Sequence, residues 1–297
     1  MTAPRPPSPR ARRGTWRIAF LCGVAWSACS GLEASADALP PSSDPGVEQS
    51  FFVRQWAVDD GTPFNSAVGV CRDRDGVLWV VGREGLFRFD GVDSRAVFRA
   101  TDREPRGLLT ATMLQDRRGR VWVTVDSGTV ACIDGAGEKV FAAGRDVPAL
   151  RPMSIADDAY GSIWLSYFRT RYLCRIADGR VEIVPANADG EQDPAQELHG
   201  SPRGTVWFTS GNRLGVLRDD RLQTLVRLDD HIVRAAPARD GGLWLVSGRR
   251  LWHWAGQGAP RDVAAAPAAP VQRLHEDRRG RLWIATAAED GAALLVR

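Results

Sequence analysis

A tryptophan preceded three positions earlier by a glycine recurs six times in the sequence, roughly every 40 residues. An aspartate stands six positions before the tryptophan in four copies, whereas Ser201 and Ala238 hold that place in the other two. The repeated pairs are Gly76 and Trp79, Gly119 and Trp122, Gly161 and Trp164, Gly204 and Trp207, Gly241 and Trp244, and Gly280 and Trp283. A unit repeated at this length predicts an architecture in which similar units stack against one another.

Each position of the repeat has its own physical role. Glycine supplies a positive φ that costs another residue roughly 1–2 kcal/mol, and the aspartate caps the turn by accepting backbone N–H bonds. The tryptophan lies in a run that is apolar at consecutive positions, as in Leu78-Trp79-Val80. Such runs predict strands that are covered on both faces. We therefore predict that the repeat residues are structural and that the fold is all-β, a β-propeller.

The strand-like runs and turns predict six four-stranded blades within residues 50–297. The expected blades cover residues 67–98, 109–141, 152–184, 196–225, 232–263 and 271–296. In the first blade, the four strands are expected at residues 67–72, 77–81, 86–90 and 95–98.

The two ends of the repeat region complement each other. The last blade stops in its third strand, at 292–296, and the strand at 51–56 precedes the first blade without a sheet of its own. We predict that residues 51–56 pair beside 292–296 and close the ring, because closure removes strand edges that invite aggregation.

Residues 1–36 have the pattern of an export signal. They combine an arginine-rich start, an apolar run at 18–28 and an Ala-x-Ala cleavage motif ending at Ala36. The apolar run is too short to span a bilayer, so we expect no membrane span in the mature chain. The protein is predicted to be exported to the periplasm, and the Pro- and Ser-rich residues 37–49 are predicted to form a flexible linker. A lipoprotein junction at Cys29 and a twin-arginine signal at Arg12-Arg13 remain alternatives.

Charge and cysteine content narrow the function classes. The net charge of +3 comes from the leader, because acidic and basic residues nearly balance after residue 36, and no nucleic-acid partner is expected. Cys71, Cys132 and Cys174 remain after cleavage. Cys132 and Cys174 hold equivalent places in neighbouring blades, where packed sheets lie about 10 Å apart and a disulfide needs Cα atoms within about 7 Å. We predict that they are free core residues.

Arginines gather in the loops predicted to lie opposite the Asp-x-x-Gly turns. Guanidinium groups bind carboxylates, sulfates and phosphates, and aromatic side chains nearby suit sugar rings. This pattern predicts a site for an acidic saccharide or a similar anion, although a chain whose only lysine is Lys139 also scatters arginine over every loop. The candidate ligand-binding residues are Arg83, Arg169, Arg171, Arg213, Arg249 and His231.

No catalytic or metal-binding constellation is recognisable. The sequence contains no nucleophile–base pair, phosphate loop or metal-ligand cluster, so we expect no enzyme activity and no cofactor. His199 and His275 occupy equivalent places in the first strand of their blades and are predicted to pack in the core or the channel. His253 is expected to pack between Trp252 and Trp254.

The form D-x-x-G-x-[LV]-W-V-x-x-x-x-G-L-x-R-F-D-G at 73–91 resembles the two-component regulator propeller repeat. The lead-in from Trp56 to Val68 is similar to the start of such sensor regions. In that family, exported propellers commonly precede an Ig-like domain, a membrane helix and a cytoplasmic histidine kinase, and many respond to carbohydrates. The resemblance implies an exported sensor propeller without its own kinase, with a small molecule or oligosaccharide as ligand and a membrane receptor or histidine kinase as partner.

A second resemblance suggests another class of protein. Residues 204–210 and 161–164 are also similar to repeats of the streptogramin (virginiamycin B) lyases, which use a loop histidine and an acid with Mg²⁺. Here only His231 is expected to be a loop histidine. A propeller lyase and a protein-interaction scaffold therefore stay as alternatives to the sensor.

Overall fold

The computed structural model describes residues 67–82, 85–99, 112–125, 127–134, 137–168, 170–186, 197–288 and 291–296. Within these ranges the chain is all-β and contains no helix. Its strands form six antiparallel sheets, each built from strands that are consecutive in the sequence.

Five sheets have four strands, and the sixth has three among the described residues. The first sheet contains β1 (Ala67–Arg72), β2 (Leu78–Gly82), β3 (Gly85–Phe89) and β4 (Ser94–Arg99). The second contains β5 (Met113–Gln115), β6 (Val121–Thr124), β7 (Val130–Asp134) and β8 (Gly137–Phe141). The third contains β9 (Pro152–Asp157), β10 (Ile163–Tyr167), β11 (Tyr172–Ala177) and β12 (Arg180–Pro185). The fourth contains β13 (Glu197–Gly200), β14 (Val206–Ser210), β15 (Arg213–Arg218) and β16 (Arg221–Arg227). The fifth contains β17 (Ile232–Pro237), β18 (Leu243–Ser247), β19 (Arg250–Trp254) and β20 (Arg261–Ala265). The sixth contains β21 (Val271–Glu276), β22 (Leu282–Ala288) and β23 (Gly291–Val296).

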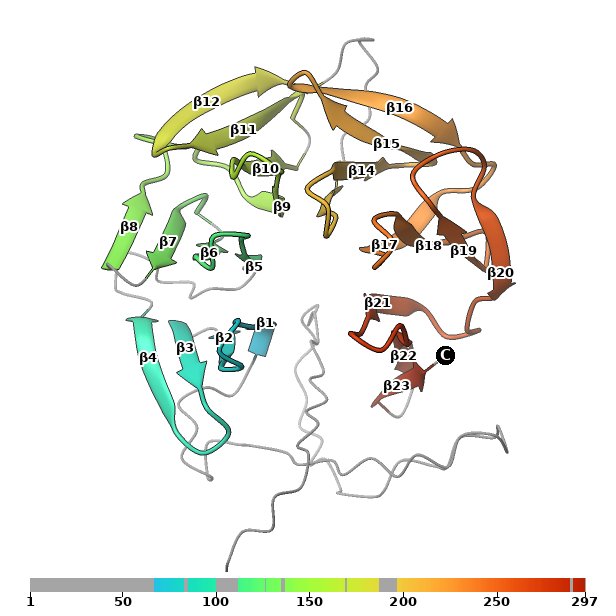
Figure 1. The fold of residues 1–297 in the computed structure, drawn as a ribbon, viewed down its shortest axis with the longest axis horizontal. Coiled ribbons are helices and arrows are strands. Elements are labelled where there is room, and N and C mark those ends of the chain that lie inside the picture. Colours follow the sequence, from blue (N-terminus) through green and yellow to red (C-terminus); the bar gives the residue numbers. More distant parts are fainter. Residues whose placement is uncertain are drawn as a thin grey trace, which may run out of the picture.

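The sheets are arranged around a common centre, as Figure 1 shows. The first strand of each sheet lies innermost, and β4, β8, β12, β16 and β20 lie on the outside. From β1 to β21, each innermost strand contacts that of the next sheet. The strand predicted to close the ring, residues 51–56, lies outside the described residues, so closure stays a prediction.

The Asp-x-x-Gly turn has the geometry that the repeat predicts. In the first sheet, Asp73 Oδ1 accepts from Val77 N (2.9 Å) and Asp73 Oδ2 accepts from the Trp79 indole Nε1 (2.9 Å). Gly76 has a φ of 89°, and the equivalent glycines of the other five turns also have positive φ. One carboxylate thus fixes both the turn and the orientation of the tryptophan that follows it.

The core is divided into clusters at the junctions between sheets. At each of the five successive junctions, buried apolar residues of one sheet pack against those of the next. At the first junction, for example, Trp79 packs in one cluster with Val121 and Val123. A sixth cluster contains Val80, Phe87 and Phe89, all from the first sheet.

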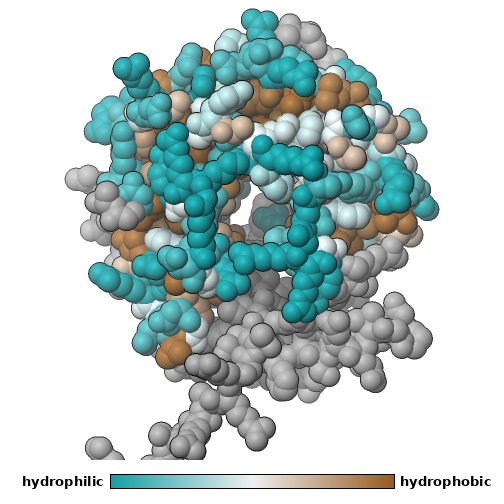
Figure 2. Space-filling view, viewed as in Figure 1, coloured by the Kyte–Doolittle hydropathy of each residue, from teal (hydrophilic) through white to brown (hydrophobic). Residues whose placement is uncertain are grey.

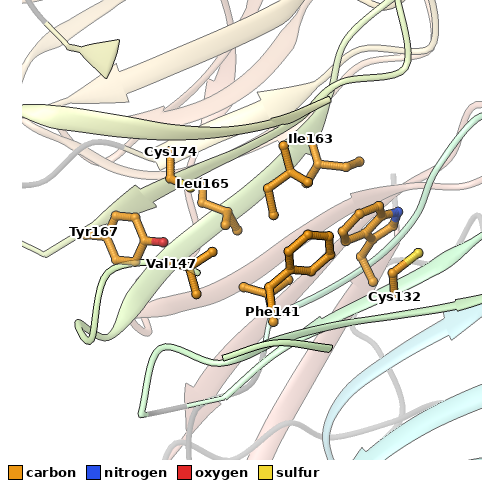
Figure 3. Packing of buried hydrophobic residues seen from close by; sticks show 10 residues of the cluster. Cys132, Phe141, Val147, Ile163, Leu165, Tyr167 and Cys174 are labelled. Carbon is orange, nitrogen blue, oxygen red and sulfur yellow. The ribbon is translucent and has the colours of Figure 1, made fainter. Parts of the chain in front are cut away.

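Cys132 and Cys174 are buried core residues, as predicted, and Cys71 is half-buried. Cys71, Cys132 and Cys174 are all free, and burial raises the pKa of Cys132 and of Cys174 to about 11. Figure 3 shows Cys132 and Cys174 at opposite sides of the cluster between the second and third sheets, with Phe141 and Leu165 among the side chains around them. Both thiols are therefore held neutral at pH 7.

Candidate functional site

The ring has a central opening whose rim is hydrophilic in the view of Figure 2. Because the strands of each sheet alternate in direction, their connections fall at two ends of the ring. We call the end with the Asp-x-x-Gly turns, which join first to second strands, the turn end. The hairpin end carries the connections from second to third strands.

Of the predicted ligand-binding arginines, Arg171, Arg213 and Arg249 lie at the hairpin end of the third, fourth and fifth sheets. Arg171 and Arg249 are exposed, and their carbonyl groups accept from Ala186 N (2.8 Å) and Ala266 N (2.9 Å), at the ends of the outermost strands. His231 is exposed just before β17. No hydrogen bond joins Arg171, Arg249 or His231 to another of these three in the described part of the chain. They share one end of the ring without forming a preassembled cluster.

Arg213 differs from its neighbours because it is buried, with only 5% of its surface exposed. The hairpin before it has two residues, so Arg213 belongs to β15 and pairs across strands with Ser210 and Arg227. Arg213 is therefore not the loop residue that the sequence predicts. The other two candidates, Arg83 and Arg169, lie outside the described residues.

Arg249 has an unusual backbone conformation. Gly248 and Arg249 form the two-residue hairpin between β18 and β19 and have φ of 57° and 60°. Such a hairpin favours glycine or asparagine at both positions, and a side chain there carries some backbone strain. This turn places the exposed Arg249 at the tip of a hairpin.

At the turn end, arginine side chains link neighbouring sheets. Arg74 donates to the carbonyl of Arg117, and Arg239 donates to the carbonyl of Arg278. Arg117 binds Asp157 Oδ2 (2.6 Å) and also reaches the carbonyl of Ser201, two sheets away. Sequence reasoning missed these links, although one signal was present. Arginine stands directly after the turn aspartate position in four of the six copies.

The two copies without the turn aspartate satisfy their indole N–H in another way. Trp207 Nε1 donates to Gly241 O (2.7 Å), and Trp244 Nε1 donates to Glu276 Oε2 (2.8 Å). Both acceptors belong to the following sheet. Loss of the aspartate thus converts a bond within a turn into a bond between sheets.

Among the described residues, no group of three potential metal ligands occurs. His199 is buried and its Nε2 lies 3.0 Å from Thr209 Oγ1, whereas His275 is exposed on β21. His253 does not pack between Trp252 and Trp254, because alternate residues of a strand face opposite sides. Its ring packs at a tilt of 52° against that of its cross-strand neighbour Trp244, and its Nε2 lies 3.0 Å from Asp240 Oδ2.

Solved structures share this architecture. Virginiamycin B lyase from Staphylococcus aureus superposes with a TM-score of 0.61 at 15% identity, over 77% of this chain and 83% of that one. The extracellular domain of a hybrid two component system from B. thetaiotaomicron gives 0.59 at 15% identity, over 82% of this chain and 35% of that one. Identities this low show the fold alone. The chain is therefore an all-β protein of the propeller class.

One copy of the repeat matches a known sequence family. The sequence model of the two component regulator propeller matches residues 266–288, which include the turn and tryptophan of the last copy. This match confirms the resemblance found in the sequence. No curated protein sequence matches the chain. Among the described residues, no helix is long and apolar enough to cross a membrane.

Proposed function

We propose that the chain is an exported sensor propeller that recognises an anionic ligand, an acidic oligosaccharide in particular, at the hairpin end. The match to the two component regulator propeller supports the sensor role, and the extracellular domain with the same fold supports export to the periplasm. The observation that carries the ligand class is the pair of exposed guanidinium groups of Arg171 and Arg249, which stand at one end of the ring.

In this proposal the six sheets form one closed ring, with residues 51–56 as the missing outer strand of the last sheet. The chain performs no chemistry of its own. It passes the ligand signal to a separate membrane receptor or histidine kinase. A closed ring suits this role because it holds loops from several sheets in fixed positions around one ligand.

Calorimetric titration with acidic and neutral oligosaccharides of matched length tests the proposal. We expect acidic members to bind, and Arg171→Gln with Arg249→Gln to weaken binding at least tenfold. The matched control is Arg218→Gln with Arg221→Gln, which removes two exposed charges from the outer hairpin of the fourth sheet. Equal binding of neutral sugars, or unchanged binding by the first variant, contradicts the proposal. Magnesium-dependent cleavage of a streptogramin would replace it with a lyase function.

A further inference from the structure

Two arginines occupy the same repeat position on neighbouring innermost strands. Arg234 lies on β17 and Arg273 lies on β21, each ten residues before the tryptophan of its sheet. The other four sheets have Gly69, Thr112, Ser154 and Glu197 at this position. β17 and β21 contact each other beside the central opening (Figure 1). Only this junction therefore combines two arginines at this level of the opening.

Both guanidinium groups bond to one carbonyl oxygen. Gln272 O accepts from Arg234 Nε (2.9 Å) and from Arg273 Nη1 (3.2 Å). Arg234 Nη1 also donates to Val233 O (2.7 Å). The two bonds to Gln272 O bring two positive charges into the same small region of the wall.

No carboxylate balances these charges within the described residues. Neither Arg234 nor Arg273 makes an ion pair there, and Glu197, at the equivalent place on β13, is not joined to Arg234. Glu276 lies near in sequence, but its Oε2 accepts from Trp244 Nε1 and Arg239 N instead. Two like charges that share a neutral acceptor repel each other, and a bound anion removes that repulsion.

Arg273 is exposed to solvent. Arg234 is half-buried, so its guanidinium is partly shielded from water. The two guanidinium groups meet at one carbonyl oxygen, and their remaining N–H groups are able to donate to one small oxyanion.

We propose that Arg234 and Arg273 form an oxyanion site on the wall of the central opening, where the fifth and sixth sheets meet. The site takes a sulfate, a phosphate or a carboxylate, either free or as part of a larger ligand. The proposal stands on this geometry and not on the sensor role.

The test is thermal unfolding with sodium sulfate or sodium phosphate, titrated at constant ionic strength. The parent protein should show a saturable rise in Tm, because a ligand bound only to the folded state stabilises it. Arg234→Gln with Arg273→Gln should weaken the apparent affinity at least tenfold. The Arg273→Gln variant alone should weaken the apparent affinity less. It should fold normally, because within the described residues the Arg273 side chain donates only to the carbonyl of the neighbouring Gln272.

The control variant, Arg218→Gln with Arg221→Gln, removes the same charge from the periphery and should respond like the parent. An equal rise in Tm for all variants would mean that the salts act generally on folded protein, and would overturn the site. A parent that does not respond would overturn it as well. If sulfate raises the Tm but no oligosaccharide binds, the oxyanion site is supported and the sensor proposal is contradicted.

Discussion

The carboxylate of Asp116 shows how single residues hold the repeat together. It is buried, and its two oxygens accept from Arg118 N (2.9 Å), Arg120 N (2.9 Å), Arg120 Nε (2.7 Å) and Trp122 Nε1 (2.8 Å). The same arrangement recurs at Asp277, where hydrogen bonds from Trp283 and Arg281 outweigh the effect of burial and lower the pKa of the carboxyl group. The aspartate is therefore the residue on which both turn and tryptophan depend.

Replacing this carboxylate should be costly. Asp116→Ala leaves two turn amides, the indole N–H and the Arg120 guanidinium without their acceptor, so we expect a loss of about 3 kcal/mol in the free energy of unfolding. Asp75→Ala, at an exposed turn position of the first sheet, should change it by less than about 0.5 kcal/mol. Urea unfolding compares the two variants. Losses of similar size would show that the carboxylate is not what holds the turn.

His199 should make the stability depend on pH. Burial lowers its pKa from 6.5 to about 4, so the unfolded chain takes up a proton at a higher pH than the folded chain does. Stability is therefore full above pH 6.5 and is lost as the pH falls toward 4, by about 2 kcal/mol between pH 7 and pH 5. His199→Gln keeps a hydrogen-bonding group for Thr209 but does not titrate.

The measurement is the free energy of unfolding at pH 7 and pH 5, for the parent and for His199→Gln. We expect the variant to lose about 2 kcal/mol less than the parent over this interval. The same substitution at an exposed histidine, His231→Gln, serves as the matched control. A variant with the same pH dependence as the parent would show that His199 is not its source.

At the scale of strands, the sequence predicted the strands that follow the repeat, but not the contacts made where a copy departs from the repeat. The strand expected at 67–72 coincides with β1, because alternating strands and turn residues leave little choice of boundary. The bond from Trp207 to Gly241 could not be predicted, because the substitution at Ser201 removes the usual acceptor without indicating which one replaces it. The burial of Arg213 depends on a two-residue hairpin, which the sequence pattern does not distinguish from a longer loop.

Close approach between β15 and β16 gives a prediction at this scale. A Cβ at Gly215 would lie 2.0 Å from Gln223 O and 2.7 Å from Phe208 Cε1, so Gly215→Ala should cost about 3 kcal/mol. A Cβ at Gly119 would meet no atom within 4 Å, but φ there is +83°, so Gly119→Ala should cost about 1 kcal/mol through backbone strain. Chemical denaturation measures the free energy of unfolding of both variants and shows which substitution costs more. A smaller cost at Gly215 would contradict the close approach.

The candidate ligand-binding residues also fall into those that the sequence predicts and those that only the structure brings together. The sequence placed Arg171 and Arg249 at one end of the ring, because the repeat fixes where each loop falls. Arg234 and Arg273 share a repeat position in the sequence, but their common acceptor, Gln272 O, is a backbone atom. The sequence pattern does not indicate such a contact, so only the structure brings these side chains together.

In the described part of the chain, six sheets lie around a common centre and pack against one another at five successive junctions (Figure 1). Five junctions have a core cluster built from two sheets, and the last sheet has three strands in the described part of the chain. A sheet with an uncovered edge invites pairing with other chains. We therefore expect the ring to need the strand at 51–56, both to complete the last sheet and to join it to the first.

Deletion of residues 51–57 tests this central claim most directly. The thermal melt of the deletion variant, followed by circular dichroism, is compared with that of the parent, and size-exclusion chromatography reports aggregation. If the strand closes the ring, the variant should aggregate or lack a cooperative transition. A soluble monomer that melts cooperatively near the Tm of the parent would contradict closure of the ring by this strand.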